Sequence, residues 1–244
     1  MRRIIQLFVR PFAIVERVLR NRIAYFAELG HGEGLPGKIA DLLSVTTLGL
    51  AIFGFVAGLS GNDVVPLRNG VQAFVSAIKL PFLFLASGLI CLPTLYYFSV
   101  LFGSRLRFLQ TVALILTAQA VAAVLAVGFA PISLLFRLSG SEPLFLVALN
   151  VGVLGLAAGL GLIFLVQGVL YIQETQPPQS ITFFTWIWLF IKGAFRSLVL
   201  AGWIAIYGLV GAQLSWTLRP FFGVPLGGHG FWSSMANVMA GLLR

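Results

Sequence analysis

Residues 108–130 read FLQTVALILTAQAVAAVLAVGFA, a run of 23 residues without a single charge. About 20 apolar residues of helix are enough to cross the hydrocarbon core of a bilayer, which is about 30 Å thick. A surface helix of a soluble domain would instead carry charged residues along its outer face. This stretch therefore predicts a transmembrane helix, and Pro131 is expected to end it or to mark its interfacial end.

Four further uncharged runs of similar length lie on either side of it, at residues 42–59, 80–102, 144–166 and 197–218. We therefore predict an all-α, polytopic transmembrane bundle of about five spans over residues 42–218. Two regions, 70–102 and 180–218, are longer than one crossing, and each is expected to begin as a half-helix in the interface. A short sixth span at 180–196 is the alternative.

The composition agrees with a membrane protein, because 59% of the 244 residues are hydrophobic and only 9% are charged. One cysteine and two histidines cannot form an internal disulfide framework, and they make a multi-ligand metal or haem site improbable. The net charge of +9 is better explained by loops facing anionic lipid than by a nucleic-acid surface. We expect no cofactor, no metal and no nucleic-acid partner.

The lysines and arginines also indicate an orientation. With the N-terminus in the cytoplasm, the cytoplasmic segments carry eleven of them and the opposite side carries five. Most of this bias lies in the N-terminal segment, and Arg105 and Arg107 in a short loop support it independently. The sequence predicts a multi-pass protein of the bacterial inner membrane with a cytoplasmic N-terminus.

The two ends of the chain are expected to lie at the membrane surface. Residues 1–41 are expected to comprise a basic amphipathic segment in the headgroup region, broken near Pro11, and a flexible glycine-rich connector at 30–37. The alternative is that this segment packs on the ends of the bundle or on a soluble partner. Residues 219–244 are expected to form a short extracytoplasmic amphipathic tail. The apolar stripe of the N-terminal segment is Ile4, Phe8, Phe12, Val15, Leu19, Ile23 and Phe26.

Small and polar residues in the spans are candidates for interactions. Gly54 with Gly58, and Gly155 with Gly159, have the spacing that lets two helix backbones approach closely. Uncharged polar side chains at membrane depth need partners, because hydrocarbon offers none. Gln119 and Asn150 are therefore expected to form hydrogen bonds between helices, or alternatively to line a polar cavity or contact a ligand or partner subunit.

No Asp, Glu or His lies within the five predicted spans. Proton-coupled transport and intramembrane aspartyl or zinc proteolysis need such groups at depth. No base that could activate a serine can be identified either, so a hydrolase triad is not supported. The sequence favours a protein that is not an enzyme.

Several stretches resemble a group of bacterial multi-pass proteins described as Yip1-like. They are KLP at 79–81, CLPTLYY at 91–97, LFGSR at 101–105 and YGLVGAQLSWTLRPFFGVP at 207–225. The resemblance implies a five-span bundle and no particular reaction. Eukaryotic Yip1 proteins engage small GTPases through a cytosolic N-terminal region, whereas this N-terminal segment is short, basic and amphipathic, so we carry over the architecture alone.

The last of these stretches contains Arg219, Pro220 and Phe221. Pro220 is expected to end a helix, Arg219 to reach lipid phosphate and Phe221 to re-enter the interface, and the three could equally form a docking surface.

Two functional hypotheses follow from these observations. The first is a non-enzymatic subunit or scaffold of a bacterial inner-membrane complex, with membrane lipids, including anionic ones, and other membrane subunits as partners. The second is a permease-like component that moves an apolar or lipid substrate and is driven by a separate ATPase. A coupling helix for that ATPase would have to come from residues 168–196.

Overall fold

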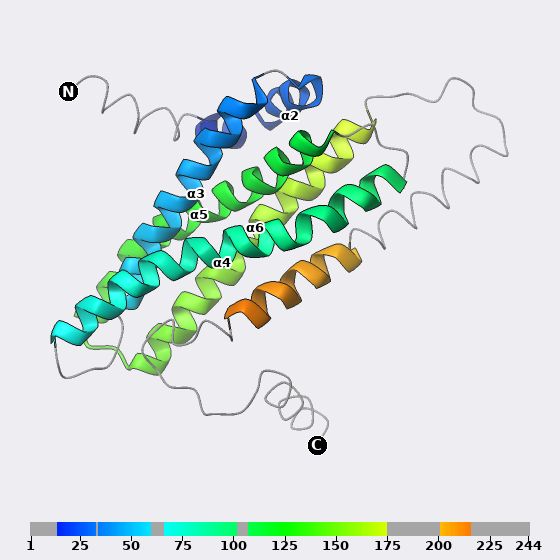
Figure 1. The fold of residues 1–244 in the computed structure, drawn as a ribbon. Helices are drawn as coiled ribbons and strands as arrows, with labels where there is room; N and C mark the ends of the chain where they lie inside the picture. Colours follow the sequence, from blue (N-terminus) through cyan, green and yellow to red (C-terminus); the bar gives the residue numbers. More distant parts are fainter. Residues whose placement is uncertain (1–13, 33, 60–65, 102–106, 175–200, 216–244) are drawn as a thin grey trace, which may run out of the picture.

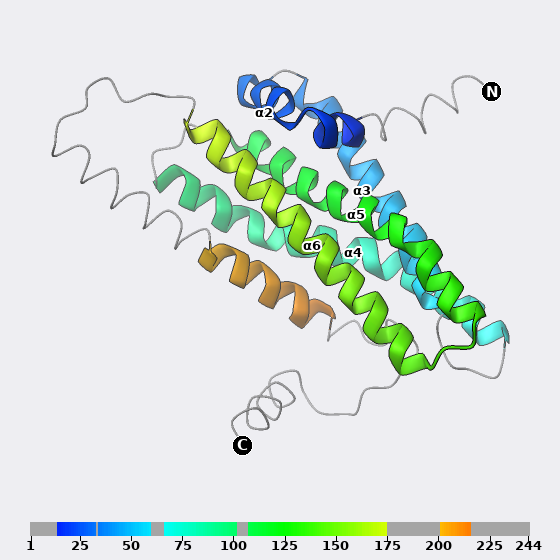
Figure 2. The ribbon, with the colours of Figure 1, turned by 180° about the vertical axis from the view of Figure 1, so that it is seen from behind.

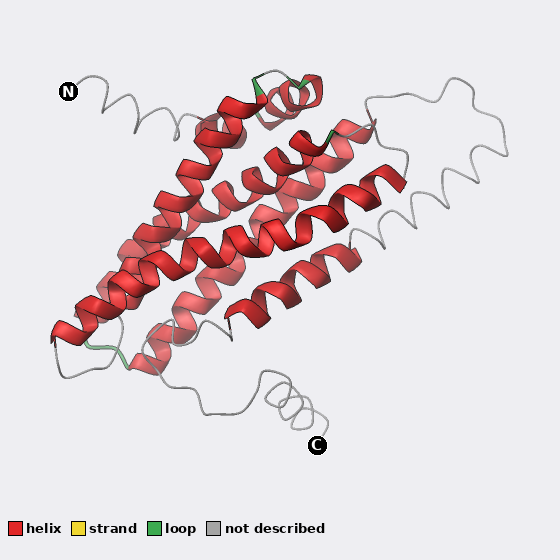
Figure 3. Ribbon diagram, viewed as in Figure 1, coloured by secondary structure: helices red, strands yellow, loops and turns green. Residues whose placement is uncertain are grey.

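The computed structural model describes residues 14–32, 34–59, 66–101, 107–174 and 201–215, and all regular structure in this part is helical (Figure 3). The all-α prediction is confirmed. The main helices are α2 (Arg22–His31), α3 (Leu35–Gly58), α4 (Pro66–Leu101), α5 (Phe108–Leu138) and α6 (Pro143–Glu174). Residues 14–20 and Ala201–Ser215 are also helical.

Among the described residues, four helices are long and apolar enough to cross a membrane: α3, α5, and the stretches Gly70–Tyr97 of α4 and Phe145–Val169 of α6. The fifth predicted span, 197–218, is represented by the shorter apolar helix Ala201–Ser215, and its two ends lie outside the described residues. Residues 180–196, the alternative sixth span, also lie outside them.

The long helices run side by side as a bundle, with α2 across one end and the Ala201–Ser215 helix beside α4 and α6 (Figures 1 and 2). Helix α5 is the core helix, because it packs against α3, α4 and α6. In the most apolar 18-residue stretch of α5, 67% of the residues are buried, whereas in the corresponding stretch of α6 only 28% are buried. One side of α6 is therefore uncovered by the described chain.

Two predicted helix ends are wrong. Helix α4 is continuous through Pro81 and Pro93, so residues 70–79 are not a separate interfacial half-helix. Helix α5 likewise passes Pro131 and ends at Leu138, so Pro131 does not end the helix, while its alternative role as the interfacial end of the span stays a prediction. A proline removes one backbone hydrogen bond, but a full break in lipid would leave more groups unpaired, so prolines are tolerated within membrane helices.

The N-terminal segment packs on the end of the bundle, which was the alternative to a position in the headgroup region. Val18, Tyr25 and Leu29 are buried, whereas Leu19 and Ile23 from the predicted apolar stripe are exposed. The helix is interrupted at Asn21, and Pro11 lies outside the described residues. Val15 and Phe26 of the predicted stripe are buried, so the predicted apolar side is confirmed only in part.

The connector predicted at 30–37 is much shorter than expected. Helix α2 extends to His31 and α3 begins at Leu35, seven residues before the predicted span. Gly32 and Gly34 have φ values of 80° and 62°, in the left-handed region that glycine adopts without strain. The earlier start also places Asp41 near the beginning of α3, so the first span does contain an acidic residue at its end.

Candidate functional site

An open pocket of about 370 Å³ lies between α4, α6 and the Ala201–Ser215 helix. Its described wall is apolar except for the hydroxyls of Ser87, Tyr207 and Ser215. This volume is within the range of small-molecule sites in proteins. The α4 and α6 residues of its wall lie in the middle of the membrane-spanning stretches Gly70–Tyr97 and Phe145–Val169, so the pocket lies at membrane depth.

The space exists because small residues line it from two helices. Gly155 of α6 and Gly208 and Gly211 of the Ala201–Ser215 helix belong to its wall. A Cβ added to any of these three glycines would meet no described atom within 4 Å. The glycines therefore keep the pocket open and do not serve a close helix contact within the described chain.

The Ala201–Ser215 helix is held against α4 by an indole. The Nε1–H of Trp203 donates a hydrogen bond to the Cys91 carbonyl oxygen at 3.1 Å, and the side chain is almost completely buried. Its ring stacks on Tyr207, with the ring centroids 5.4 Å apart. This contact fixes Tyr207 at the inner wall of the pocket.

Gln119 of α5 reaches toward the same place. Its Nε2 donates to the Phe84 carbonyl oxygen at 2.5 Å and to the Tyr207 hydroxyl at 3.3 Å. Its Oε1 is buried and has no hydrogen-bond partner among the described residues. A Cβ at Gly88 would overlap the Gln119 amide nitrogen, so the glycine makes room for this side chain.

Gln119 also lines a second, much smaller void of about 10 Å³. Phe84, Ala158, Leu162 and Tyr207 line both this void and the larger pocket. The two spaces are therefore adjacent. The hydrogen bonds between helices predicted for Gln119 are present. Gln119 also lines a cavity, but this cavity is mostly apolar, and the alternative of a contact with a ligand or partner subunit stays a prediction.

Asn150 has a different position. It is fully buried in α6, and its Oδ1 accepts a hydrogen bond from Ser133 of α5 at 2.7 Å. Its Nδ2 has no hydrogen-bond partner within the part of the chain that the structure describes, and the residue lines neither of the two spaces. The structure does not bring Asn150 and Gln119 into one site.

The glycine pairs differ as well. A Cβ on Gly54 would approach the Ser76 carbonyl oxygen of α4 to 2.6 Å, and one on Gly58 would approach the Ala73 Cα to 2.7 Å. The close approach predicted for this pair is confirmed. For Gly155 and Gly159 it is wrong within the described helices, because neither has a described atom within 4 Å. In α6 it is Gly161 and Gly168 that pack closely on their neighbours.

Arg219, Pro220 and Phe221 lie outside the described residues, as does the predicted tail at 219–244. No group of three or more His, Cys, Asp or Glu side chains in the described chain is placed to hold a metal ion.

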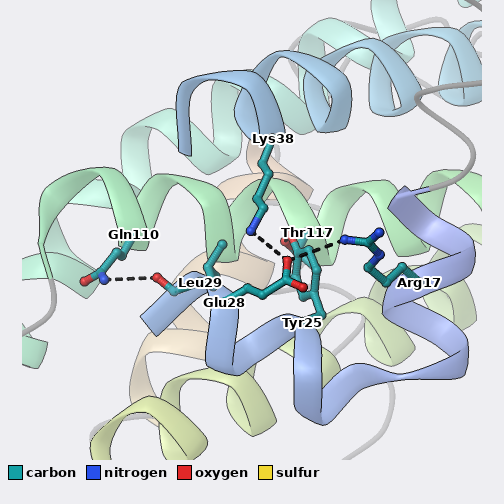
Figure 4. A network of polar contacts seen from close by, with 7 residues as sticks. All are labelled: Arg17, Tyr25, Glu28, Leu29, Lys38, Gln110 and Thr117. Carbon is teal, nitrogen blue, oxygen red and sulfur yellow. Dashed lines mark hydrogen bonds and ion pairs between the residues drawn. The ribbon is translucent and has the colours of Figure 1, made fainter. Parts of the chain in front are cut away.

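A polar network at the α2 end of the bundle was not predicted (Figure 4). Tyr25 and Thr117 share a buried hydrogen bond of 2.9 Å, and Gln110 Nε2 donates to the carbonyl oxygens of Leu29 and Gly30 at 3.0 and 2.8 Å. Thr117 already donates to the Ala113 carbonyl oxygen, so Tyr25 is the donor in the shared bond. The one available sequence signal was Gln110, a long amide in the first turn of an apolar span.

Charges complete this network. The Glu28 carboxylate accepts a hydrogen bond from Lys38 at 3.0 Å and lies 3.5 Å from Arg17. The Lys38 hydrogen bond and the two positive charges lower the pKa of Glu28. Burial raises the pKa of Tyr25, which keeps its hydroxyl protonated as a donor. The network therefore ties α2 to both α3 and α5.

No protein-family model, curated protein or solved structure matches the chain. The arguments about function therefore depend on the geometry described above. The α2 end is a closed structural contact, whereas the space between α4, α6 and the Ala201–Ser215 helix is open and has the volume of a small-molecule site.

Proposed function

We propose that the protein is a non-enzymatic subunit or scaffold of an assembly in the bacterial inner membrane. The observation that supports this is the uncovered face of α6. Gly152, Leu156, Gly159 and Ile163 are spaced three or four residues apart and share one face of the helix, and all four are exposed.

Such a face suits a second transmembrane helix. Lipid removes the hydrophobic drive for helix association, so helices pair through close van der Waals packing, which small residues permit. Gly159 has open space around its Cα, and Leu156 and Ile163 on either side would pack against the incoming helix. Gly155 lies between this face and the pocket, so a bound helix would also border the pocket mouth.

The proposed orientation has the N-terminus in the cytoplasm. Arg17, Arg20, Arg22, Lys38 and Arg107 lie at the α2 end of the bundle, whereas Arg68 in the first turn of α4 and Arg137 in the last turn of α5 lie at the other end. Positive charge concentrates on the cytoplasmic side of bacterial membrane proteins and attracts anionic lipid. Exposed Leu19 and Ile23 beside these arginines support contact of this end with the membrane surface.

Site-specific photocrosslinking in cells tests the subunit proposal. A photoreactive amino acid replaces Leu156 on α6, which is 63% exposed, and in the control it replaces Leu89 on α4, which is 71% exposed. We expect a discrete protein adduct from position 156, lost when Gly159 is changed to Leu, and none from position 89. Lipid adducts alone at both positions would contradict the proposal.

A permease-like component is the second candidate, and the apolar pocket is the observation that favours it. An intramembrane pocket open between helices could hold an apolar substrate during movement. This candidate requires a separate ATPase partner. Its test is ATP hydrolysis by a co-purified ATPase that rises when the apolar substrate is added and falls when Gly211 is changed to Phe.

A further inference from the structure

The pocket and the small void beside it differ in size and in chemistry. The pocket, about 370 Å³, is apolar, whereas the void, about 10 Å³, is lined by Gln119, whose buried Oε1 has no donor among the described residues. An unpaired polar atom buried in a low-dielectric setting is costly, on the order of 1–3 kcal/mol. The acceptor therefore favours any ligand that brings a hydrogen-bond donor to it.

The size of the void limits that donor. About 10–15 Å³ of this kind of space holds a single water-sized group. A hydroxyl fits, whereas a phosphate or a sugar does not. Because the amide nitrogen of Gln119 already donates to Phe84 and Tyr207, the free carbonyl oxygen is the atom left for the ligand.

The charge of the ligand is limited as well. Neither space has a charged side chain among its described lining residues. A phosphate or carboxylate placed there would lose its hydration and gain no counter-charge, which is strongly unfavourable at membrane depth. The polar part of the ligand should therefore be neutral.

We propose that the space between α4, α6 and the Ala201–Ser215 helix is a binding site for a neutral lipid alcohol. The hydrocarbon chain occupies the apolar pocket, and the hydroxyl enters the void and donates a hydrogen bond to Gln119 Oε1. This site does not require the partner helix on Gly159, so the two proposals can fail separately.

The test uses the full chain in nanodiscs of phosphatidylcholine and two photoreactive probes of equal length. One probe is a sixteen-carbon alcohol with a diazirine in its chain, and the other is the corresponding alkane without the hydroxyl. We expect the alcohol to be captured about tenfold more than the alkane, because only the alcohol satisfies the buried acceptor. Peptide mapping should place the adducts on α4, α6 or residues 201–215.

Three variants separate the two parts of the site. Gln119→Leu removes the acceptor and should reduce capture of the alcohol to the level of the alkane. Gly211→Phe fills the pocket and should reduce capture of both probes about tenfold. Gly202→Phe is the matched control on the same helix, because Gly202 is exposed, has open space around it and is not part of the wall.

Equal capture of the two probes by the unmodified protein would overturn the role of Gln119, and would mean that water occupies the void. Capture that Gly211→Phe leaves unchanged would overturn the pocket itself, and would mean labelling from the bulk bilayer. Because the comparison of probes is made on the unmodified protein, it does not depend on the folding of any variant. A lost crosslink at Leu156 with intact alcohol selectivity would contradict the subunit proposal alone.

Discussion

Gln110 and Gln119 lie on the same helix, α5, and only 4% and 3% of their surfaces are exposed, yet their surroundings differ completely. Gln110 uses both ends of its amide, because Oε1 accepts from the Arg107 backbone at 2.8 Å and Nε2 donates to two carbonyl oxygens at the end of α2. Gln119 uses only its nitrogen.

The two glutamines represent two regions of the bundle. At the α2 end, side chains from three helices meet and satisfy one another, which is the arrangement expected of a structural contact. Beside α6, glycines leave space and a buried acceptor lacks a donor. Burial alone therefore does not distinguish these two glutamines, whereas the completeness of their hydrogen bonding does.

The largest expected effect comes from filling a closed contact. Gly54→Leu should lower the free energy of unfolding by about 3 kcal/mol, because the new side chain meets the α4 backbone at Ser76, which cannot yield without separating the helices. Gly159→Leu, the matched change on the open face of α6, should leave stability unchanged. Denaturant titration in detergent micelles measures both, and similar losses would mean that the α6 face is not open.

Exchanging each glutamine for leucine compares the two regions directly. Gln110→Leu should cost about 2 kcal/mol, because it leaves the Leu29 and Gly30 carbonyl oxygens without their side-chain donor. Gln119→Leu should change stability by less than about 0.5 kcal/mol, since it removes an unpaired acceptor and the Phe84 carbonyl oxygen keeps the Ser87 hydroxyl as a donor. Equal losses in the same titration would contradict the distinction.

Removing a single hydroxyl should lower the free energy of unfolding by less than these changes do, and again by more at the α2 end than beside α6. Tyr25→Phe should cost about 1 kcal/mol, because it deletes a buried hydrogen bond of 2.9 Å to Thr117. Tyr207→Phe should cost only a few tenths, on the order of 0.3 kcal/mol, because its bond from Gln119 is long at 3.3 Å. Thermal unfolding of the two variants side by side checks the order, and a larger loss at Tyr207 would reverse it.

The spans themselves could be predicted, because a charge-free run of about 20 residues has few alternatives. The start of α3 could not be predicted, because Lys38 and Asp41 interrupt the apolar run. The sequence does not show that Lys38 is paired with Glu28, which lets the helix begin before these charges. The continuity of α4 through Pro81 could not be predicted either, because a proline usually breaks or kinks a helix. Packing within the bundle overrides that effect here.

The pocket was only partly predictable. The sequence identifies Gln119 as polar and in need of a partner, but it cannot show that Phe84 and Tyr207 use only its nitrogen. The spacing of Gly155 and Gly159 matches that of Gly54 and Gly58, yet only the second pair faces a described helix. Which side of a helix meets a neighbour depends on rotation about its axis, and apolar spans give little periodic signal to set that rotation.

The smallest expected effect is a pH dependence confined to the α2 end. The pKa of Glu28 is lower in the folded protein than its usual 4.5, so its carboxylate contributes stability that is fully present above that pH. The contribution is lost as the pH falls through the lowered folded value. It should amount to no more than about 0.2 kcal/mol, because the pair is partly exposed.

The difference in unfolding free energy between the unmodified protein and Glu28→Gln, measured from pH 7 to pH 3, isolates this contribution. The difference should shrink only below about pH 4.5, whereas a constant or growing difference would exclude the ion pair as its source. Capture of the lipid alcohol should not change over the upper part of this range, from pH 7 to pH 5. The described walls of the pocket and of the void have no carboxylate or histidine, so a titration there would show that the two regions are coupled.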